Sequence, residues 1–204
     1  KDDNQMEETI AYNTIGSVIH DTLEELYKPC ENKLLSVEDV NGMLKIKDKI
    51  VDKNFQKIFK LGNLTKGKNL IIVETAKRYI ENFLKKEMKD IKEGNEIKIL
   101  AVEKKFETVI DLSEELKNIK IRGKIDRIDS VNGVTRVIDY KTGGQIKQTD
   151  LNIKQYEEIF KDKKYSNIFQ LLFYCLAIED DKKYNFPVEA GIISFRSLDS
   201  GVIK

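Results

Sequence analysis

The sequence predicts an α/β fold with a helical first half and a sheet in the second half. Up to about residue 95, apolar side chains recur at helical spacing, every three or four positions. From Ile97 the apolar positions alternate with period 2, which is typical of strands. Asn132-Gly133 separates two further runs of β character, and this dipeptide is the strongest short hairpin signal that a sequence offers. We therefore expect one domain over residues 1–204, with a mainly helical part at 1–95 and the sheet at 96–204.

Three helices are expected in the first part, over residues 14–27, 36–59 and 69–91. Thr14 is a suitable N-cap for the first helix. Ser36-Val-Glu-Asp39 resembles a capping box at the start of the second. The third helix carries lysines and acidic residues on its polar face, which is typical of a solvated surface but could also follow a phosphate backbone.

The second part is expected to contain strands at residues 97–110, 120–131, 134–141, 189–195 and 202–204. Residues 145–165 show no clear period, which predicts a loop with a short helix. An apolar helix is expected from Ser166 to about Glu179. Gln170 and Tyr174 lie four positions apart in it and so share one face. Taken alone, this pair is interpreted as a structural amide and phenol at the edge of the apolar face of the helix.

The Asn-Gly hairpin brings two carboxylates together. A two-residue turn places Asp126 directly opposite Asp139, and Lys141 follows on the same face because side chains alternate with period 2. Like charges in facing positions destabilise a sheet. Either a cation lies between the carboxylates or one of them holds a proton. Lys124, opposite Lys141, would neutralise part of this charge, which keeps a purely structural role open.

The other face of the hairpin pairs Asp129 with Arg136. We expect an ordinary surface ion pair that contributes under ~1 kcal/mol to stability. Such a pair does not explain the two facing aspartates, however. A divalent cation with open coordination sites would, because Mg²⁺ prefers a few carboxylates together with water and phosphate oxygens. A lysine beside it suits phosphodiester hydrolysis, in which charge develops on phosphate.

Four short motifs follow one another along the chain, and together they cover about residues 12–178. Ile15-Gly16-Ser-Val-Ile-His20 comes first, GKIDRID at 123–129 and VIDYKTG at 137–143 follow, and Gln170-Leu-Leu-Phe-Tyr174 comes last. This series resembles the PD-(D/E)XK nuclease superfamily, specifically its RecB/AddB-like nuclease domains. The resemblance implies a restriction-endonuclease-like core, in which helices flank a mixed β-sheet that contains the antiparallel hairpin.

The resemblance also implies roles for individual residues. Mg²⁺ or Mn²⁺ would be bound by His20, Asp126, Asp139 and the carbonyl of Tyr140. Asp126, Asp139 and Lys141 would be catalytic, with Lys141 assisting the attacking water. Gln170 and Tyr174 would line a DNA-facing helix, and Glu103 is a further acidic position. Without the resemblance, His20 is typical of a histidine at the edge of a core, hydrogen-bonded to a carbonyl.

We therefore expect a Mg²⁺-dependent DNA nuclease. Its expected role is that of a single-stranded-DNA exonuclease that processes double-strand-break ends, together with a helicase subunit or helicase domain. One alternative is a catalytically inactive nuclease-fold module that serves DNA binding or complex assembly. Another is a metal-dependent phosphodiesterase that acts on RNA or small nucleotides.

Composition narrows these possibilities. The chain carries 36 Lys and Arg against 35 Asp and Glu, and this net charge of +1 argues against wholesale coating of nucleic acid. No membrane association is expected, because no run of about 18 apolar residues occurs. The cytoplasm is the expected location. Some relatives bind an iron–sulfur cluster through four cysteines, and with only Cys30 and Cys175 no such cluster is expected here. The first residue is not Met and the last three predict a strand, so we expect a fragment of a longer protein.

Overall fold

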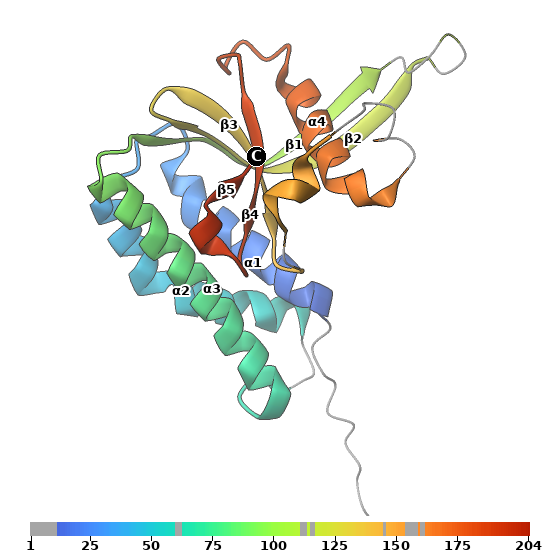
Figure 1. The fold of residues 1–204 in the computed structure, drawn as a ribbon. Coiled ribbons are helices and arrows are strands. Elements are labelled where there is room, and N and C mark those ends of the chain that lie inside the picture. Colours follow the sequence, from blue (N-terminus) through green and yellow to red (C-terminus); the bar gives the residue numbers. More distant parts are fainter. Residues whose placement is uncertain are drawn as a thin grey trace, which may run out of the picture. The chain divides into compact units, whose positions relative to one another are not determined.

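The computed structural model describes residues 12–59, 63–110, 114, 117–144, 146–153, 159 and 162–204. The chain divides into two compact units (Figure 1). The helical unit comprises residues 1–29 and 36–93, and the sheet unit comprises residues 30–35 and 94–204. The expectation of a single domain remains a prediction. Among the described residues, no helix has both the length and the apolar character needed to cross a bilayer.

The helical unit contains the three predicted helices, α1 (Tyr12–Tyr27), α2 (Val37–Ile58) and α3 (Gly67–Lys92), which pack against one another. Their apolar stripes form a core that includes Ile19, Leu23, Phe55, Ile80 and Leu84. The predicted capping box is confirmed: Ser36 Oγ accepts the Asp39 N–H at 3.1 Å, and Asp39 Oδ2 accepts the Ser36 N–H at 2.9 Å. The expectation that Thr14 caps α1 is wrong, because the helix already includes Tyr12.

The polar face of α3 is engaged in local ion pairs. Lys85 pairs with Glu81 one turn away, and Lys86 Nζ lies 3.4 Å from Asp90 Oδ1. Such pairs between positions i and i+4 stabilise an exposed helix modestly. This face therefore agrees with the solvated-surface interpretation of the charge pattern.

The sheet unit is built on five strands, β1 (Ile97–Ile110), β2 (Ile119–Val131), β3 (Val134–Lys141), β4 (Glu189–Ser194) and β5 (Val202–Ile203). They lie side by side in chain order. The β3–β4 pair is parallel and the other pairs are antiparallel, which confirms the predicted mixed sheet. Parallel neighbours need a long crossover, and here the crossover contains α4 (Ser166–Ile178).

Short 3-10 helices complete the fold: η1 (Lys28–Cys30), η2 (Gln148–Leu151), η4 (Lys163–Tyr165) and η5 (Leu198–Ser200). Two of them lie in the predicted loop at 145–165, of which residues 145, 154–158, 160 and 161 fall outside the described residues.

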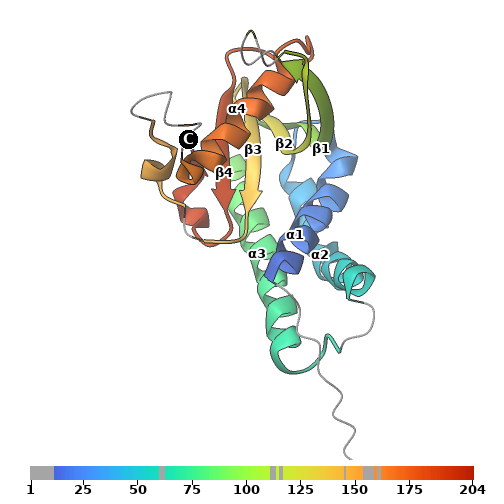
Figure 2. The ribbon, with the colours of Figure 1, turned by 90° about the vertical axis from the view of Figure 1, so that its right-hand side faces the viewer.

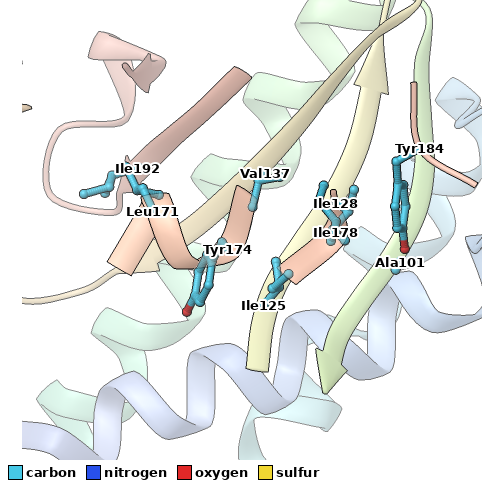
Figure 3. Packing of buried hydrophobic residues seen from close by; sticks show 9 residues of the cluster. All are labelled: Ala101, Ile125, Ile128, Val137, Leu171, Tyr174, Ile178, Tyr184 and Ile192. Atoms are coloured by element: carbon cyan, nitrogen blue, oxygen red, sulfur yellow. The ribbon is translucent and has the colours of Figure 1, made fainter. Parts of the chain in front are cut away.

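Helix α4 covers one face of the sheet (Figure 2). It contributes Leu171, Tyr174 and Ile178 to a cluster of nine buried residues (Figure 3). The sheet side of the cluster includes Val137 from β3 and Ile192 from β4. Because this apolar face packs on the sheet, α4 also holds the polar groups of Gln170 and Tyr174 next to Lys141 and Asp139 of β3.

The hairpin has the predicted register. Asn132 and Gly133 have φ of 51° and 87°, both in the left-handed region that a type I′ turn requires. Val131 pairs with Val134, and the ladder continues to the Arg127–Ile138 pair. The next positions along the two strands are Asp126 and Asp139, so the prediction that they lie beside each other rests on a confirmed register.

Candidate active site

Four polar side chains form a closed ring at the end of β3. Lys141 Nζ lies 2.8 Å from Asp139 Oδ2 and donates to Gln170 Oε1 at 2.9 Å. Gln170 Nε2 donates to the Tyr174 hydroxyl at 2.6 Å, and that hydroxyl donates to Asp139 Oδ1 at 3.4 Å. Strand β3 provides two of these residues and α4 provides the other two, one helical turn apart. The sequence predicted all four as site residues, and the fold brings them together.

Tyr174 belongs both to this ring and to the buried hydrophobic cluster between α4 and the sheet. Its side chain is buried, and its ring packs edge-on against Phe106 of β1 with centroids 6.1 Å apart. Burial raises the pKa of the Tyr174 hydroxyl well above its ordinary value, and the negative charges of Asp126 and Asp139 raise it further. The hydroxyl therefore keeps its proton and acts as a donor. Both carboxylates lie within electrostatic reach of this one group.

Asp126 occupies the position where the β2–β3 ladder ends. Its Oδ2 accepts the backbone N–H of Tyr140 at 2.7 Å, in place of a backbone carbonyl. Asp126 and Asp139 are both almost fully buried, with 6% and 2% of their surfaces exposed. Buried carboxylates are costly unless they are hydrogen-bonded or paired with cations. Asp139 has Lys141 as its cationic neighbour, whereas Asp126 has the Tyr140 amide.

Glu103 joins the site from β1. It lies between the Val102–Arg127 and Lys104–Ile125 pairs, opposite Asp126. A carboxylate oxygen of Glu103 lies within 4.8 Å of one of Asp126. Glu103 has a φ of 50°, an uncommon conformation for a residue with a side chain and one that clusters at functional sites. Lys124 forms an ion pair with Glu103.

This backbone turn at Glu103 changes which side chains face α4. Ala101 belongs to the cluster beneath α4, and Lys104 also reaches it, because Lys104 Nζ contacts the Tyr184 hydroxyl at 3.0 Å. On β2, Ile125 and Ile128 both belong to the cluster. Residues three apart on a regular strand point to opposite faces. The alternation of side chains between the two faces of the sheet therefore shifts by one residue on both strands, at the facing residues Glu103 and Asp126.

The opposite face of β2 carries a buried ion cluster. Arg136 binds Asp129 with two parallel hydrogen bonds, both 2.8 Å long. Arg127 Nε lies 2.7 Å from Asp129 Oδ2, and Arg127 Nη1 is 3.5 Å from the Tyr140 hydroxyl. Arg127 and Asp129 are fully buried. The predicted Asp129–Arg136 pair is confirmed, but its expected location at the surface is wrong, because Asp129 lies in a buried cluster that extends to Tyr140.

Burial alone would raise the pKa of Asp129, but the charge of Arg127 and the hydrogen bonds and charge of Arg136 outweigh it and hold that pKa below its ordinary value. The carboxylate stays ionised inside the sheet unit. Because Arg127 directly follows Asp126 in the chain, this cluster fixes the backbone that carries one of the site carboxylates.

His20, the remaining predicted ligand, lies on α1 one turn after Gly16 and is half-buried. It belongs to the helical unit, and its role as a metal ligand stays a prediction. The cysteines are free thiols, and burial raises the pKa of Cys175. Sequence reasoning missed the role of Arg127, although Asp129 lies two positions further along the strand, on the same face, and is a visible ion-pair partner.

A family model described as PD-(D/E)XK nuclease superfamily matches residues 2–201. No curated protein matches the chain significantly. The matched span contains the four-residue ring, Asp126, Glu103 and His20. The mixed five-stranded sheet and the helical first half agree with the restriction-endonuclease-like α/β fold of this superfamily, so the predicted fold class is confirmed.

Proposed function

This chain belongs to the PD-(D/E)XK nuclease superfamily, and from this we propose that it is a divalent-metal-dependent deoxyribonuclease that hydrolyses phosphodiester bonds. The observation that carries the proposal is the ring in which Asp139 and Gln170 hold the ammonium group of Lys141, at the end of the hairpin that also carries the buried carboxylate of Asp126. A nuclease fold that had lost its activity would have no need to keep this ring intact.

The donor set fits Mg²⁺ or Mn²⁺. Members of this superfamily typically use divalent metals. Carboxylate and carbonyl oxygens are the ligands that these hard cations prefer. The residues that would bind the ion are Asp126, Asp139 and the Tyr140 carbonyl, together with His20 as implied by the family motif. Glu103 adds a second carboxylate next to Asp126. When bound, such a cation polarises the phosphate and lowers the pKa of water.

The protein groups have separate tasks around the scissile phosphate. Lys141 offers a fixed positive charge that can orient the attacking water and neutralise charge on the phosphate oxygens. Gln170 and Asp139 determine where this charge lies, since each holds one side of the ammonium group. Tyr174 holds Asp139 and Gln170 in turn. The water adds to phosphorus, the bond from phosphorus to one sugar oxygen breaks, and that oxygen receives a proton.

The finer assignment follows the motif series. We propose that the substrate is single-stranded DNA and that the chain degrades it as an exonuclease during double-strand-break processing. A helicase subunit or helicase domain would supply the strand. This proposal rests on the resemblance of the four motifs to RecB/AddB-like nuclease domains, and the near-neutral net charge agrees with a partner that delivers the DNA.

End-labelled DNA and RNA strands test the activity. We expect cleavage of single-stranded DNA with Mg²⁺ or Mn²⁺ and none with EDTA. Asp139→Asn and Lys141→Gln should each lower the rate by ~100-fold or more, as removal of one preorganised charged group does. Asp199→Asn, an exposed acid in η5, is the matched control and should cleave like wild type. An unaltered rate in Asp139→Asn would refute the assigned mechanism, and preferred cleavage of RNA would refute the substrate.

Thermal unfolding provides a second readout that does not depend on turnover. A cation that binds only the folded protein stabilises it by about 2.7 kcal/mol at a concentration of 100 times Kd. Mn²⁺ should therefore raise the melting temperature of wild type and of Asp199→Asn, but raise that of Asp126→Asn little. Metal stabilisation without cleavage would identify an inactive module. An equal response of all three proteins would place the metal elsewhere.

A further inference from the structure

Strands β1 and β2 continue beyond the active site as a two-stranded ribbon. We call the paired segments Lys104–Ile110 and Ile119–Ile125 the outer ribbon. Strand β3 pairs with β2 only from Arg127 to Val131 and so does not reach the ribbon. Isolated two-stranded ribbons are marginally stable in water, and long exposed strand edges invite association. A ribbon of this length therefore calls for an explanation.

One face of the outer ribbon is strongly basic. The facing pairs on it are Lys105–Lys124, Glu107–Arg122 and Val109–Lys120. All six side chains are exposed. Four basic residues and one acidic residue give this face a local charge of +3, whereas the whole chain carries only +1. The positive charge of this face is therefore a local feature, because the chain as a whole is nearly neutral.

Only part of the positive charge on this face is neutralised, because Lys124 pairs with Glu103 at the base of the ribbon. Lys105 faces Lys124 directly, and like charges in facing positions destabilise a sheet. Among the described residues, Lys105, Lys120 and Arg122 take part in no ion pair of 4.0 Å or less. Several lysines of α3 differ in this respect, because they pair with acids nearby.

The ribbon is joined to the active site at its base. Lys124 pairs with Glu103, the neighbour of Asp126. On the opposite face of the ribbon, Phe106 packs against Tyr174 of the four-residue ring. Its ring also lies over Gly123, where a Cβ would come within 2.8 Å of the Phe106 carbons. The basic face itself reaches the site through the Lys124–Glu103 pair, next to Asp126.

We propose that the basic face of the outer ribbon binds the phosphate backbone of the DNA strand whose end lies in the active site. This proposal deepens the proposed nuclease function and depends on it for the identity of the ligand. Lys105, Lys120 and Arg122 each contact phosphate, and Lys124 links the bound strand to Glu103. Backbone contacts of this kind carry no sequence information, which suits an enzyme that degrades any sequence.

Binding without cleavage tests the proposal. The probe is a fluorescein-labelled oligo(dT) strand, measured by fluorescence anisotropy in EDTA over a range of salt concentrations. The test protein carries Lys105→Gln, Lys120→Gln and Arg122→Gln. Its matched control carries Lys45→Gln, Lys49→Gln and Arg78→Gln, which remove the same number of exposed positive charges from α2 and α3. Neither set includes a residue of the active site.

We expect the ribbon variant to bind at least ~10-fold more weakly than wild type at low salt, and the control to bind like wild type. Each lost phosphate contact lowers the salt slope of single-strand binding by about 0.7, so the ribbon variant should lose roughly 2 from that slope. Equal affinities and slopes in the two variants would refute the proposal. So would aggregation of the ribbon variant without loss of affinity, because the charges would then only protect a strand edge.

Cleavage separates this proposal from the nuclease function. If wild type binds oligo(dT) through the ribbon but does not cleave it with Mg²⁺ or Mn²⁺, the ribbon proposal stands and the nuclease proposal fails. If wild type cleaves DNA and the ribbon variant binds and cleaves equally well, the nuclease proposal stands and the ribbon proposal fails. Ribbon-dependent binding that favours RNA of the same length would refute DNA as the ligand.

Discussion

The backbone N–H of Tyr140 donates to Asp126 Oδ2 over 2.7 Å, just beyond the Arg127–Ile138 pair that ends the β2–β3 ladder. A side-chain carboxylate here replaces the carbonyl of a partner strand. The contact explains how two acidic residues share the end of a hairpin: Asp126 binds a main-chain amide, while Asp139 keeps Lys141. The charges of both carboxylates act on the Tyr174 hydroxyl.

The Tyr174 hydroxyl connects the two halves of the four-residue ring, so its removal should lower activity without unfolding the protein. Tyr174→Phe keeps the ring against Phe106 but loses the contacts to Asp139 and Gln170. A hydrogen bond to a charged group contributes about 1.5–3 kcal/mol, and the Asp139 contact is long, so kcat/KM should fall by roughly tenfold.

Tyr184→Phe is the control for this change. Tyr184 lies in the same buried cluster, but its hydroxyl accepts from Lys104 outside the ring. It should cleave DNA within about twofold of wild type while showing a similar change in melting temperature. Equal losses of activity in the two variants would mean that the Tyr174 hydroxyl acts only through stability.

The buried cluster around Asp129 should make stability depend on pH in acid. The folded-state pKa of Asp129 is depressed, so its contribution is fully present above the unfolded value of about 3.9 and is lost as the pH falls through the folded value. Asp129→Asn should therefore cost about 3–5 kcal/mol at pH 7, as breaking a buried pair does. The difference from wild type should persist at pH 5 and shrink below about pH 4.

Urea unfolding at these pH values measures the effect. Asp181→Asn is the control, because Asp181 pairs with Lys104 at 2.6 Å on the surface, where such pairs contribute under ~1 kcal/mol. A loss of similar size in the two variants would show that the Asp129 cluster contributes no more to stability than a surface ion pair does.

The same substitution should have opposite signs at two glycines. A Cβ at Gly191 would lie 2.7 Å from the backbone oxygen of Ile203, so Gly191→Ala must displace β5 and should destabilise by about 1–3 kcal/mol. At Gly42, inside α2, nothing lies within 4 Å of the added atom. Gly42→Ala should stabilise by about 0.5–1 kcal/mol, because glycine is a poor helix former. Thermal unfolding checks both signs, and destabilisation by Gly42→Ala would contradict this account.

Much of the fold follows from local patterns. The helical stripes, the capping box at Ser36 and the Asn132-Gly133 turn depend on neighbouring residues, so the sequence alone predicts them. The register of the hairpin follows as well, because a two-residue turn leaves no freedom in pairing. This register is enough to place Asp139 and Lys141 on one face and to bring Asp126 to the same end.

Other features depend on contacts between distant segments. Nothing near Glu103 in the sequence predicts a left-handed residue, since the conformation arises where β1 meets Asp126 of β2. The expected alternation along β1 therefore fails at that point. Asp129 was expected at the surface for a similar reason, because a period of 2 identifies a face but not whether other elements cover it.

Turn chemistry and periodicity act over a few residues, so the sequence predicts the hairpin register that brings Asp126 and Asp139 together, whereas Gln170 and Tyr174 entered the candidate site through the resemblance of the motif series. The positions of Lys141 between Asp139 and Gln170, of Tyr174 beside both, and of Asp126 at the Tyr140 amide come from the tertiary structure. Three of these contacts join residues 14, 29 and 35 positions apart. They form because the apolar face of α4 packs on the sheet, and that packing fixes distances which no local pattern encodes.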